Sequence, residues 1–307
     1  MKIDKVSDLL YAFIRNDKKK IALGFESCIA NEREGAVKDR LRHAYDEYKR
    51  REGYAVVQQL EPAIQMLVSA PYRECTFDDL FLTEKIKACT DRFLLEWANK
   101  DYLIENGLVP MNKILLEGPP GNGKTSFTIA LAKRLNLPLI NTNSSLMLDS
   151  YLGKSEKNVA LLFKNIPENC VLLFDEFEAM ASARGRIGED SGGAGRAWNS
   201  IVTSFLVNME TIRPSILFIA ATNRIDMLDK AVLRRFDMTI RFDNPNNRNK
   251  NSYIEKYLKT YNLNPDDFLI ESGNIAQALS YSDMERVMRL RHKEIILKNL
   301  INGGEKK

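Results

Sequence analysis

The chain carries the sequence GPPGNGKT at residues 118–125, and this stretch decides the fold and the chemistry expected of the rest. It fits the pattern G-x-x-x-x-G-K-[ST], which is typical of a loop that holds nucleotide phosphates. Gly121 and Gly123 can adopt backbone angles that a Cβ would forbid, so that successive N–H groups turn inward around a polyphosphate. The Lys124 ammonium can reach the β- and γ-phosphates, and the Thr125 hydroxyl can bind Mg²⁺. The motif predicts that the chain binds a nucleoside triphosphate.

The sequence on either side of this loop has the context that the motif requires. Residues 113–117 read as a short apolar strand, and residues 126–135 contain good helix formers with apolar side chains spaced to line one face. A helix that starts at the loop adds N–H donors and a dipole that favours anions. We therefore expect the nucleotide to be held by Gly118, Pro119, Pro120, Gly121, Asn122, Gly123, Lys124, Thr125 and Ser126.

The composition is that of an ordinary globular protein. The 307 residues are 44% hydrophobic and 28% charged, which suits one large domain or two to three small ones. A net charge of +4 is too small to argue for nucleic acid or a membrane surface as partner. The four cysteines lack C-x-x-C spacing, which indicates reduced thiols in a cytoplasmic protein.

Three further features are not expected from the sequence: a zinc or histidine-based catalytic site, a membrane span and a signal peptide. The chain has only two histidines, His43 and His292, so that a zinc site or a histidine-based catalytic triad is not expected. No apolar run approaches about 18 residues, so no membrane span is expected. The N-terminus has no long apolar core behind its lysines, which argues against a signal peptide.

The first 72 residues or so predict helices. Apolar residues recur at helical spacing in three stripes, at 6–14, 21–29 and 37–48. Each stripe is narrow and has to be covered by another helix, so we expect a small N-terminal helical bundle or hairpin. The basic runs at 18–20 and 49–51 fit either solvated helix ends or a nucleic-acid contact.

From about residue 76, apolar strands alternate with helical segments. The expected strands are 113–117, 138–141, 171–175, 216–222 and 238–242. Near-continuous apolar strands separated by helices predict an α/β fold with a parallel sheet covered on both faces. Ligands of such sheets lie at the carboxyl ends of the strands.

Polar side chains follow two of these strand ends. One strand ends in Asp175 and Glu176, and paired acids behind a buried strand need a partner such as Mg²⁺ beside the phosphate loop. Asp175 would hold the metal and Glu176 would polarise the attacking water. The alternative is an acid pair at a helix N-terminus. Asn223 ends the next strand, where its amide either contacts the γ-phosphate or the water, or caps a turn.

The motifs together resemble the AAA ATPases of the AAA+ superfamily over residues 77–296. FDDL at 77–80 resembles the segment beside the adenine pocket, while GPPGNGKT and LLFDE resemble the Walker A and Walker B motifs. AATN and the later LDKAVLRRFD resemble the second region of homology. The resemblance implies a P-loop NTPase with a parallel five-stranded sheet and a small helical lid, with ATP and Mg²⁺ as cofactors.

The resemblance also assigns roles to single residues. It makes Asn223 the first sensor of the γ-phosphate and gives Arg234 and Arg235 the arginine-finger role. The family usually separates these arginines by Pro-Gly, whereas here they are adjacent, as in the katanin and spastin branch. Either arginine therefore remains a candidate for the phosphate contact, and the pair could also be surface groups at a helix end.

A further segment resembles the first pore loop of AAA proteins that thread polypeptides. It reads DSYLGKSE at 149–156, and in such a loop Tyr151 and Leu152 would grip the substrate. An aromatic ring suits this task because it packs on an extended chain of any sequence. The alternative is an ordinary turn tyrosine. The glycine-rich segment 184–195 lies in the place of the second pore loop.

We expect three regions. Residues 1–74 would form a helical region that recruits a partner or substrate, residues 75–245 the large α/β nucleotide-binding domain, and residues 246–307 the helical lid. SDME at 282–285 is a capping-box signature for a long helix in the lid. Arg286 is a candidate for a second sensor.

The resemblance implies an ATP-hydrolysing, cytoplasmic homo-oligomer, expected to be a hexameric ring that remodels or unfolds proteins. The helical N-terminal region followed by one AAA module also resembles small bacterial ATPases that are encoded beside a subtilisin-like serine protease and are associated with antiviral defence. That likeness implies a serine protease as effector partner. Two alternatives stay open: a nucleotide-gated scaffold for an effector, and a nucleic-acid-handling AAA+ ATPase. The mild charge and the pore-loop signature argue against the second.

Overall fold

The computed structural model describes residues 12, 18–32, 35–45, 60, 65, 67–69, 75–142, 152–181, 202–265 and 278–304. Three sequence predictions lie outside these residues, wholly or nearly so. They concern Tyr151, the glycine-rich segment 184–195 and the first apolar stripe at 6–14.

The centre of the fold is a six-stranded sheet with the order β1-β3-β4-β5-β2-β6. Five strands are mutually parallel, as predicted. They are β2 (Lys113–Glu117), β3 (Leu139–Thr142), β4 (Val171–Phe174), β5 (Leu217–Thr222) and β6 (Met238–Arg241). The sequence analysis missed the sixth strand, β1 (Val68–Ser69), which pairs antiparallel with β3 at the edge. Two residues are too few to show the alternation that marks a strand.

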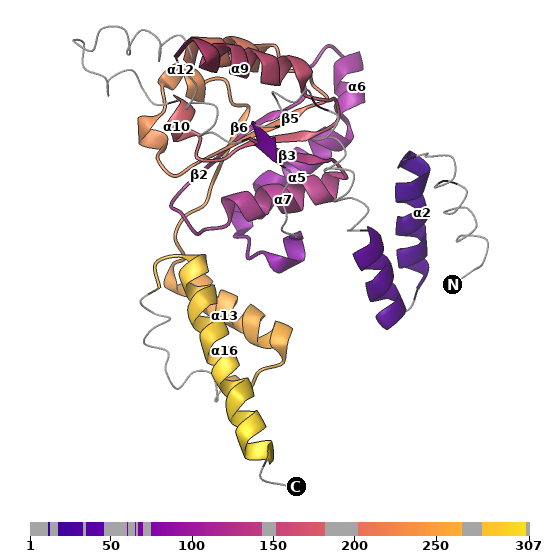
Figure 1. Cartoon of the computed structure of the whole chain (residues 1–307), viewed down its shortest axis with the longest axis vertical. Coiled ribbons are helices and arrows are strands. Elements are labelled where there is room, and N and C mark those ends of the chain that lie inside the picture. The colour runs from indigo at the N-terminus through magenta and orange to yellow at the C-terminus, as the bar shows by residue number, and fades with distance from the viewer. Residues whose placement is uncertain are drawn as a thin grey trace.

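Helices cover both faces of the sheet, as the continuous apolar strands predicted (Figure 1). On one face, α5 (Glu84–Ala98) and α7 (Lys124–Leu135) pack against the strands through side chains such as Phe93 and Phe127. On the other face, α9 (Leu152–Asn165) and the helix at 202–210 contribute Leu162 and Phe205. The remaining short elements are η1 (Phe77–Asp79), α6 (Lys100–Glu105), α10 (Glu178–Ala181), η2 (Ile225–Met227) and α12 (Lys230–Leu233).

Strand β4 shows why this sheet needs cover on both sides. All of its residues are buried, and successive side chains join opposite cores. Leu172 and Phe174 pack in the core on the α9 face, whereas Val171 and Leu173 pack in the core on the α7 face. Because side chains alternate along a strand, an apolar run is stable only when both faces are covered.

Two helix pairs lie outside the sheet layers. Near the N-terminus, α2 (Lys18–Asn31) and the helix at 36–45 share a small core in which the rings of Phe25 and Tyr45 stack with centroids 4.9 Å apart. This core uses the second and third apolar stripes of the sequence. Near the C-terminus, α13 (Asn247–Tyr261) and α16 (Tyr281–Gly304) pack through a cluster that includes Met284 and Met288. Within the described residues, every helix is too short or too polar to cross a membrane.

The cap of α16 differs from the predicted one. The sequence signature made Ser282 the capping residue, whereas the structure begins the helix at Tyr281 and caps it with Ser280. The Ser280 hydroxyl accepts the N–H of Asp283 at 3.2 Å and donates to its carboxylate at 2.7 Å. These hydrogen bonds lower the pKa of Asp283. The shift of two residues frees Ser282 and Glu285 for the cavity described below.

Strand β2 ends at a glycine where no other residue fits. Gly118 has a φ of +135°, and a Cβ at this position would lie 2.1 Å from the backbone carbonyl oxygen of Phe242. The N–H of Gly118 also donates to the Thr222 carbonyl oxygen of the adjacent strand. The backbone that follows β6 thus lies directly beside the end of β2 and against Gly118.

We expect Gly118→Ala to destabilise the fold by about 3 kcal/mol or more, because a strained φ and a backbone clash act together. Gly107→Ala is the matched control. Gly107 also has a positive φ, +75°, but a Cβ there would meet nothing within 4 Å. The control should cost only about 1–2 kcal/mol, the usual penalty for a left-handed residue. Urea unfolding of both variants tests the difference, and equal losses would contradict the close approach.

Candidate active site

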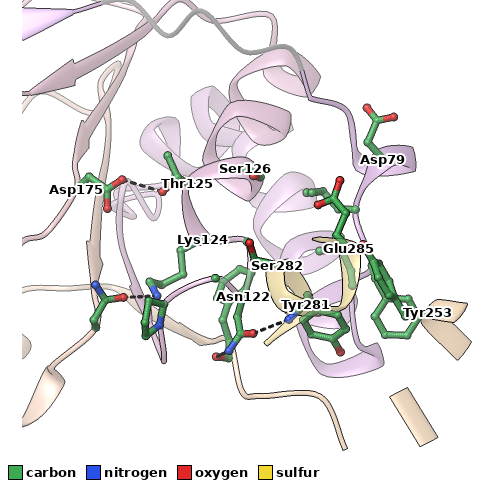
Figure 2. A pocket seen from close by; sticks show the side chains of 18 of the residues that line it. Asp79, Asn122, Lys124, Thr125, Ser126, Asp175, Tyr253, Tyr281, Ser282 and Glu285 are labelled. Carbon is green, nitrogen blue, oxygen red and sulfur yellow. Dashed lines mark hydrogen bonds between the residues drawn. The ribbon is translucent and has the colours of Figure 1, made fainter. Parts of the chain in front are cut away.

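A cavity of about 390 Å³ opens at the carboxyl edge of the parallel strands. Most of the predicted phosphate-loop residues line it, from Pro120 to Ser126, together with Asp175, Glu176 and Asn223. The structure adds a second wall, of which only the segment FDDL at 77–80 was expected beside the nucleotide. This wall comprises Asp79, Leu80, Phe81, Leu82, Phe242, Tyr253, Tyr281, Ser282 and Glu285. Figure 2 shows the loop on one side of the cavity and the side chains of α13 and α16 on the other.

The loop has the backbone that the motif predicted. Gly121 and Gly123 have φ values of +77° and +91°, in the left-handed region. Gly123 is the N-cap of α7, and its carbonyl accepts the N–H of Phe127 at 2.7 Å. The N–H groups of the first turn of α7 therefore face the cavity edge without an intrahelical partner, which is where a phosphate is bound best.

Lys124 is the residue that joins the loop to the neighbouring strand. Its side chain is buried, and its ammonium donates to the Gly118 and Pro119 carbonyl oxygens at 2.6 and 2.9 Å and to Asn223 Oδ1 at 2.7 Å. Burial lowers the pKa of Lys124, while the nearby carboxylates of Asp175 and Glu178 oppose that shift. Gly118 and Pro119 thus serve the site through their carbonyl groups, outside the cavity lining.

Thr125 and Asp175, the two residues predicted to bind the metal, contact each other directly. The Thr125 hydroxyl donates to Asp175 Oδ2 at 2.7 Å, and Asp175 Oδ1 accepts the N–H of Glu176 at 3.0 Å (Figure 2 draws the first bond). One hydroxyl and one carboxylate form a fitting half-site for Mg²⁺, which usually completes its shell with water and phosphate oxygens. Among the described residues, no group of three or more Asp, Glu, His or Cys side chains forms a site that protein ligands alone would complete.

Glu176 adopts a backbone conformation that is unusual for its type. Its φ is +51°, in the left-handed region, and its side chain is exposed at the cavity. The next residue, Phe177, is fully buried and its N–H donates to the Ala221 carbonyl oxygen at 2.9 Å. The chain therefore turns sharply after β4, which projects one carboxylate outward between two anchored residues. Strain of this kind is often found at functional positions.

The sequence analysis missed Glu178, which holds the end of β5 in place. Its carboxylate accepts the Thr222 hydroxyl at 2.6 Å and the backbone N–H of Asn223 at 3.3 Å. Because Asn223 Oδ1 in turn accepts from Lys124, Glu178 positions the partner of the buried ammonium. The sequence contained one signal for it, since Glu178 is the third acidic residue within four positions of a strand end.

The two arginines lie outside the cavity and differ from each other. Arg235 is half-buried and its guanidinium binds Glu210 at 2.6 Å and the Ala231 carbonyl oxygen at 2.8 Å. Arg234 is exposed at the end of α12 and, within the described part of the chain, its side chain makes no ion pair or hydrogen bond. Asp237, which follows the two arginines, is held against the start of β2. Its carboxylate accepts the N–H groups of Asn112 and Lys113 at 3.0 and 2.9 Å.

The other predicted site residues are Arg286, on α16, and Leu152 and Tyr151, of the expected pore loop. Arg286 is exposed and does not line the cavity, where Glu285 stands instead. Leu152 is the first residue of α9, and its presumed companion Tyr151 falls outside the described residues.

Comparison with known proteins gives a consistent answer. Residues 114–244 match the family described as ATPase family associated with various cellular activities (AAA). An uncharacterized AAA family ATPase of Sinorhizobium fredii is 33% identical over 205 residues, which cover 66% of this chain and 59% of that protein. Proteasome-activating nucleotidase 1 of Haloferax volcanii is 30% identical over 249 residues, which cover 76% of this chain and 60% of that protein.

A third relative, from Kocuria rhizophila, is named an AAA ATPase forming ring-shaped complexes. It is 28% identical over 268 residues, which cover 80% of this chain and 46% of that protein. The matched region thus spans about half to three fifths of the length of these curated relatives.

The role of Glu178 can be tested separately from the phosphate loop. In Glu178→Ala the Thr222 hydroxyl, which is buried, loses its acceptor, so we expect a loss of about 1–3 kcal/mol in unfolding free energy. Phosphate release from ATP should also fall, because Asn223 is no longer held against Lys124. Glu168→Ala, which removes an exposed pair with Arg213, should cost at most about 1 kcal/mol and leave phosphate release unchanged. Wild-type phosphate release in a destabilised Glu178→Ala protein would reduce Glu178 to a purely structural role.

Proposed function

Because the chain belongs to the AAA family of ATPases, we propose that it binds ATP with Mg²⁺ and hydrolyses it to ADP and phosphate at the interface between copies in a ring. The phosphate loop would bind the triphosphate through its backbone N–H groups and Lys124. Thr125 and Asp175 would hold the metal, which supplies positive charge at the β- and γ-phosphates.

In this proposal Lys124, Glu176 and Asn223 each have a role in hydrolysis. The Lys124 ammonium would exchange two loop carbonyls for phosphate oxygens while it stays close to Asn223. Glu176, on its outward turn, would orient the attacking water and polarise it. Asn223, held by Glu178, would position that water against the γ-phosphate. Positioning and charge stabilisation are the main contributions that a protein makes to phosphoryl transfer.

The main observation in support of a site shared between copies is the shortage of positive charge in the cavity. Among the described residues that line it, Lys124 is the only basic one, beside the four carboxylates of Asp79, Asp175, Glu176 and Glu285. Phosphoryl transfer develops further negative charge, which an arginine from outside commonly stabilises. Arg234 is exposed and, within the described residues, its side chain makes no ion pair or hydrogen bond, so we assign the finger to Arg234 of an adjacent copy.

We further propose that the ring, expected to be a cytoplasmic hexamer, remodels or unfolds proteins. Two relatives support this: one is named for ring-shaped complexes and another for activating a proteasome. Residues 1–74 would recruit the substrate or partner, 75–245 would bind the nucleotide, and 246–307 would act as the lid. Tyr151 and Leu152 would grip the polypeptide. A serine protease partner in antiviral defence remains a proposal that rests on the sequence resemblance alone.

Arg234 and Arg235 differ in exposure and in their contacts, and this difference gives a direct test. Arg234→Ala should keep the melting temperature and the ATP affinity, and lower turnover by about 10³-fold or more, as for other arginine fingers. Arg235→Ala should instead lower the melting temperature, because it breaks the contacts with Glu210 and Ala231. Glu210→Gln is the matched control and should reproduce part of that loss of stability with little effect on turnover.

Mixing variants then locates the finger. A mixture of Arg234→Ala and Lys124→Ala proteins should regain some turnover, because a hybrid interface combines an intact phosphate loop with an intact Arg234. Native mass spectrometry confirms that the two variants share rings. Mixed rings without any regained turnover would place Arg234 in its own site and refute a finger supplied by the adjacent copy.

Protein remodelling is tested at Tyr151. Tyr151→Ala should keep ATP turnover near the wild-type rate but abolish unfolding of a green fluorescent protein that carries an unstructured tail, while Tyr151→Phe should retain most of the unfolding activity. A core tyrosine would behave differently, because its loss typically costs about 3–5 kcal/mol and would lower stability and turnover together. If Tyr151→Ala unfolds the tagged protein as well as wild type does, Tyr151 is not the gripping residue. If wild-type protein hydrolyses ATP but does not unfold the tagged protein, the nucleotide-gated scaffold becomes the better description.

A further inference from the structure

Asn122, in the middle of the phosphate loop, is buried although its neighbour Gly121 is exposed. Its side-chain amide is fully used. The Nδ2 group donates to Asn244 Oδ1 at 2.8 Å and to the Phe242 carbonyl oxygen at 3.4 Å, and Oδ1 accepts the backbone N–H of Tyr281 at 3.3 Å. Figure 2 shows the last of these bonds crossing from the loop to the start of α16.

The three partners belong to the two places where the chain reaches the C-terminal helices. Phe242 and Asn244 lie between β6 and α13, and Tyr281 is the first residue of α16. One side chain therefore connects the phosphate loop to the segment that leads into α13 and to the first residue of α16. The sequence motif leaves this position free, since it is one of the four unspecified residues between the two glycines.

The backbone beside Asn122 reinforces the contact. The Ser282 N–H donates to the Gly121 carbonyl oxygen at 3.0 Å. A Cβ on Gly121 would lie 2.9 Å from the Ser280 hydroxyl oxygen, so the start of α16 rests directly on the loop. A shift of either the loop or α16 would leave a buried amide without partners, and this favours their moving together.

We propose that Asn122 is a positioning residue that couples the phosphate loop to α13 and α16, so that the phosphates held by the loop determine where these helices lie. The proposal rests on the proposed function only in requiring that a triphosphate occupies the loop. Asn122 acts through its neighbours, because its amide faces the helices while the backbone of the loop faces the phosphates. Removing the side chain should separate nucleotide binding from the helix response.

A second attachment of the same helices provides a matched control. The Lys256 ammonium, on α13, donates to the Leu80 carbonyl oxygen at 2.7 Å and to that of Asp78 at 2.5 Å. This contact ties α13 to the segment that contains η1 and bypasses the phosphate loop. Lys256→Met should therefore loosen the helices without removing their response to the nucleotide.

Hydrogen exchange measured by mass spectrometry on the full chain tests the coupling. Wild-type protein, Asn122→Ala and Lys256→Met are compared free, with ADP and with a non-hydrolysable ATP analogue, and nucleotide affinity is measured on the same samples. In wild type and Lys256→Met, the nucleotide should change exchange in peptides from the first turns of α13 and α16. Each protein is measured at a nucleotide concentration that saturates its own site, and in Asn122→Ala that change should be lost although the site is filled.

Several outcomes would overturn the coupling. One is a wild-type-sized change in Asn122→Ala, and another is an equal loss of the change in Lys256→Met. If Asn122→Ala fails to fold, Asn244→Ala removes the shorter of the two contacts that Asn122 makes toward α13 and leaves the one with Phe242. The response of α13 should then be reduced, and an undiminished response there would also refute the proposal. Wild-type protein that binds the analogue but shows no change in either helix would refute the coupling alone. Wild-type protein that fails to bind the analogue would refute the proposed function.

Discussion

The site depends on one buried ammonium group. Lys124 Nζ lies among three oxygen acceptors, two from the loop after β2 and one from Asn223 at the end of β5. Taking an ammonium out of water is costly unless acceptors and opposite charges surround it. The strand order supplies these, because β2 lies next to β5 and β5 next to β4, so that Asn223 and Asp175 both come to the loop. The strand order is therefore what brings the acceptors and carboxylates to the buried ammonium of Lys124.

The charges around Lys124 leave the described part of the site with more negative than positive groups. Asp175, Glu176 and Glu178 lie within a few residues of each other at the end of β4, and a bound triphosphate would add further negative charge. Lys124 alone cannot balance this, and its own pKa is already lowered by burial. In the function proposed above, the missing positive charge would come with the ligand, as Mg²⁺, and from Arg234 of an adjacent copy. Under that proposal, the cavity would hydrolyse ATP only after copies of the chain assemble.

Local signals predicted much of this molecule, and tertiary contacts decided the rest. The loop and the five parallel strands could be predicted because apolar runs and glycine positions are local properties of the sequence. Strand β1 could not, since its two residues carry no pattern. The cap of α16 moved from Ser282 to Ser280 because either serine has an acidic residue three positions on. The difference between Arg234 and Arg235 depends on Glu210, which is distant in sequence.

Two glycines of the phosphate loop have to satisfy two requirements at the same position, a positive φ and the absence of a Cβ. These requirements connect the shape of the phosphate site to the position of the segments packed on it. Gly121 needs a left-handed φ so that the loop can close around phosphates, and it also needs to lack a Cβ so that α16 can rest on it. Gly118 meets the same two requirements against the backbone of Phe242. The contacts that shape the phosphate site are therefore the contacts that locate the C-terminal helices. A loop that adjusts to the loss of one phosphate would therefore disturb the contacts that hold the start of α16.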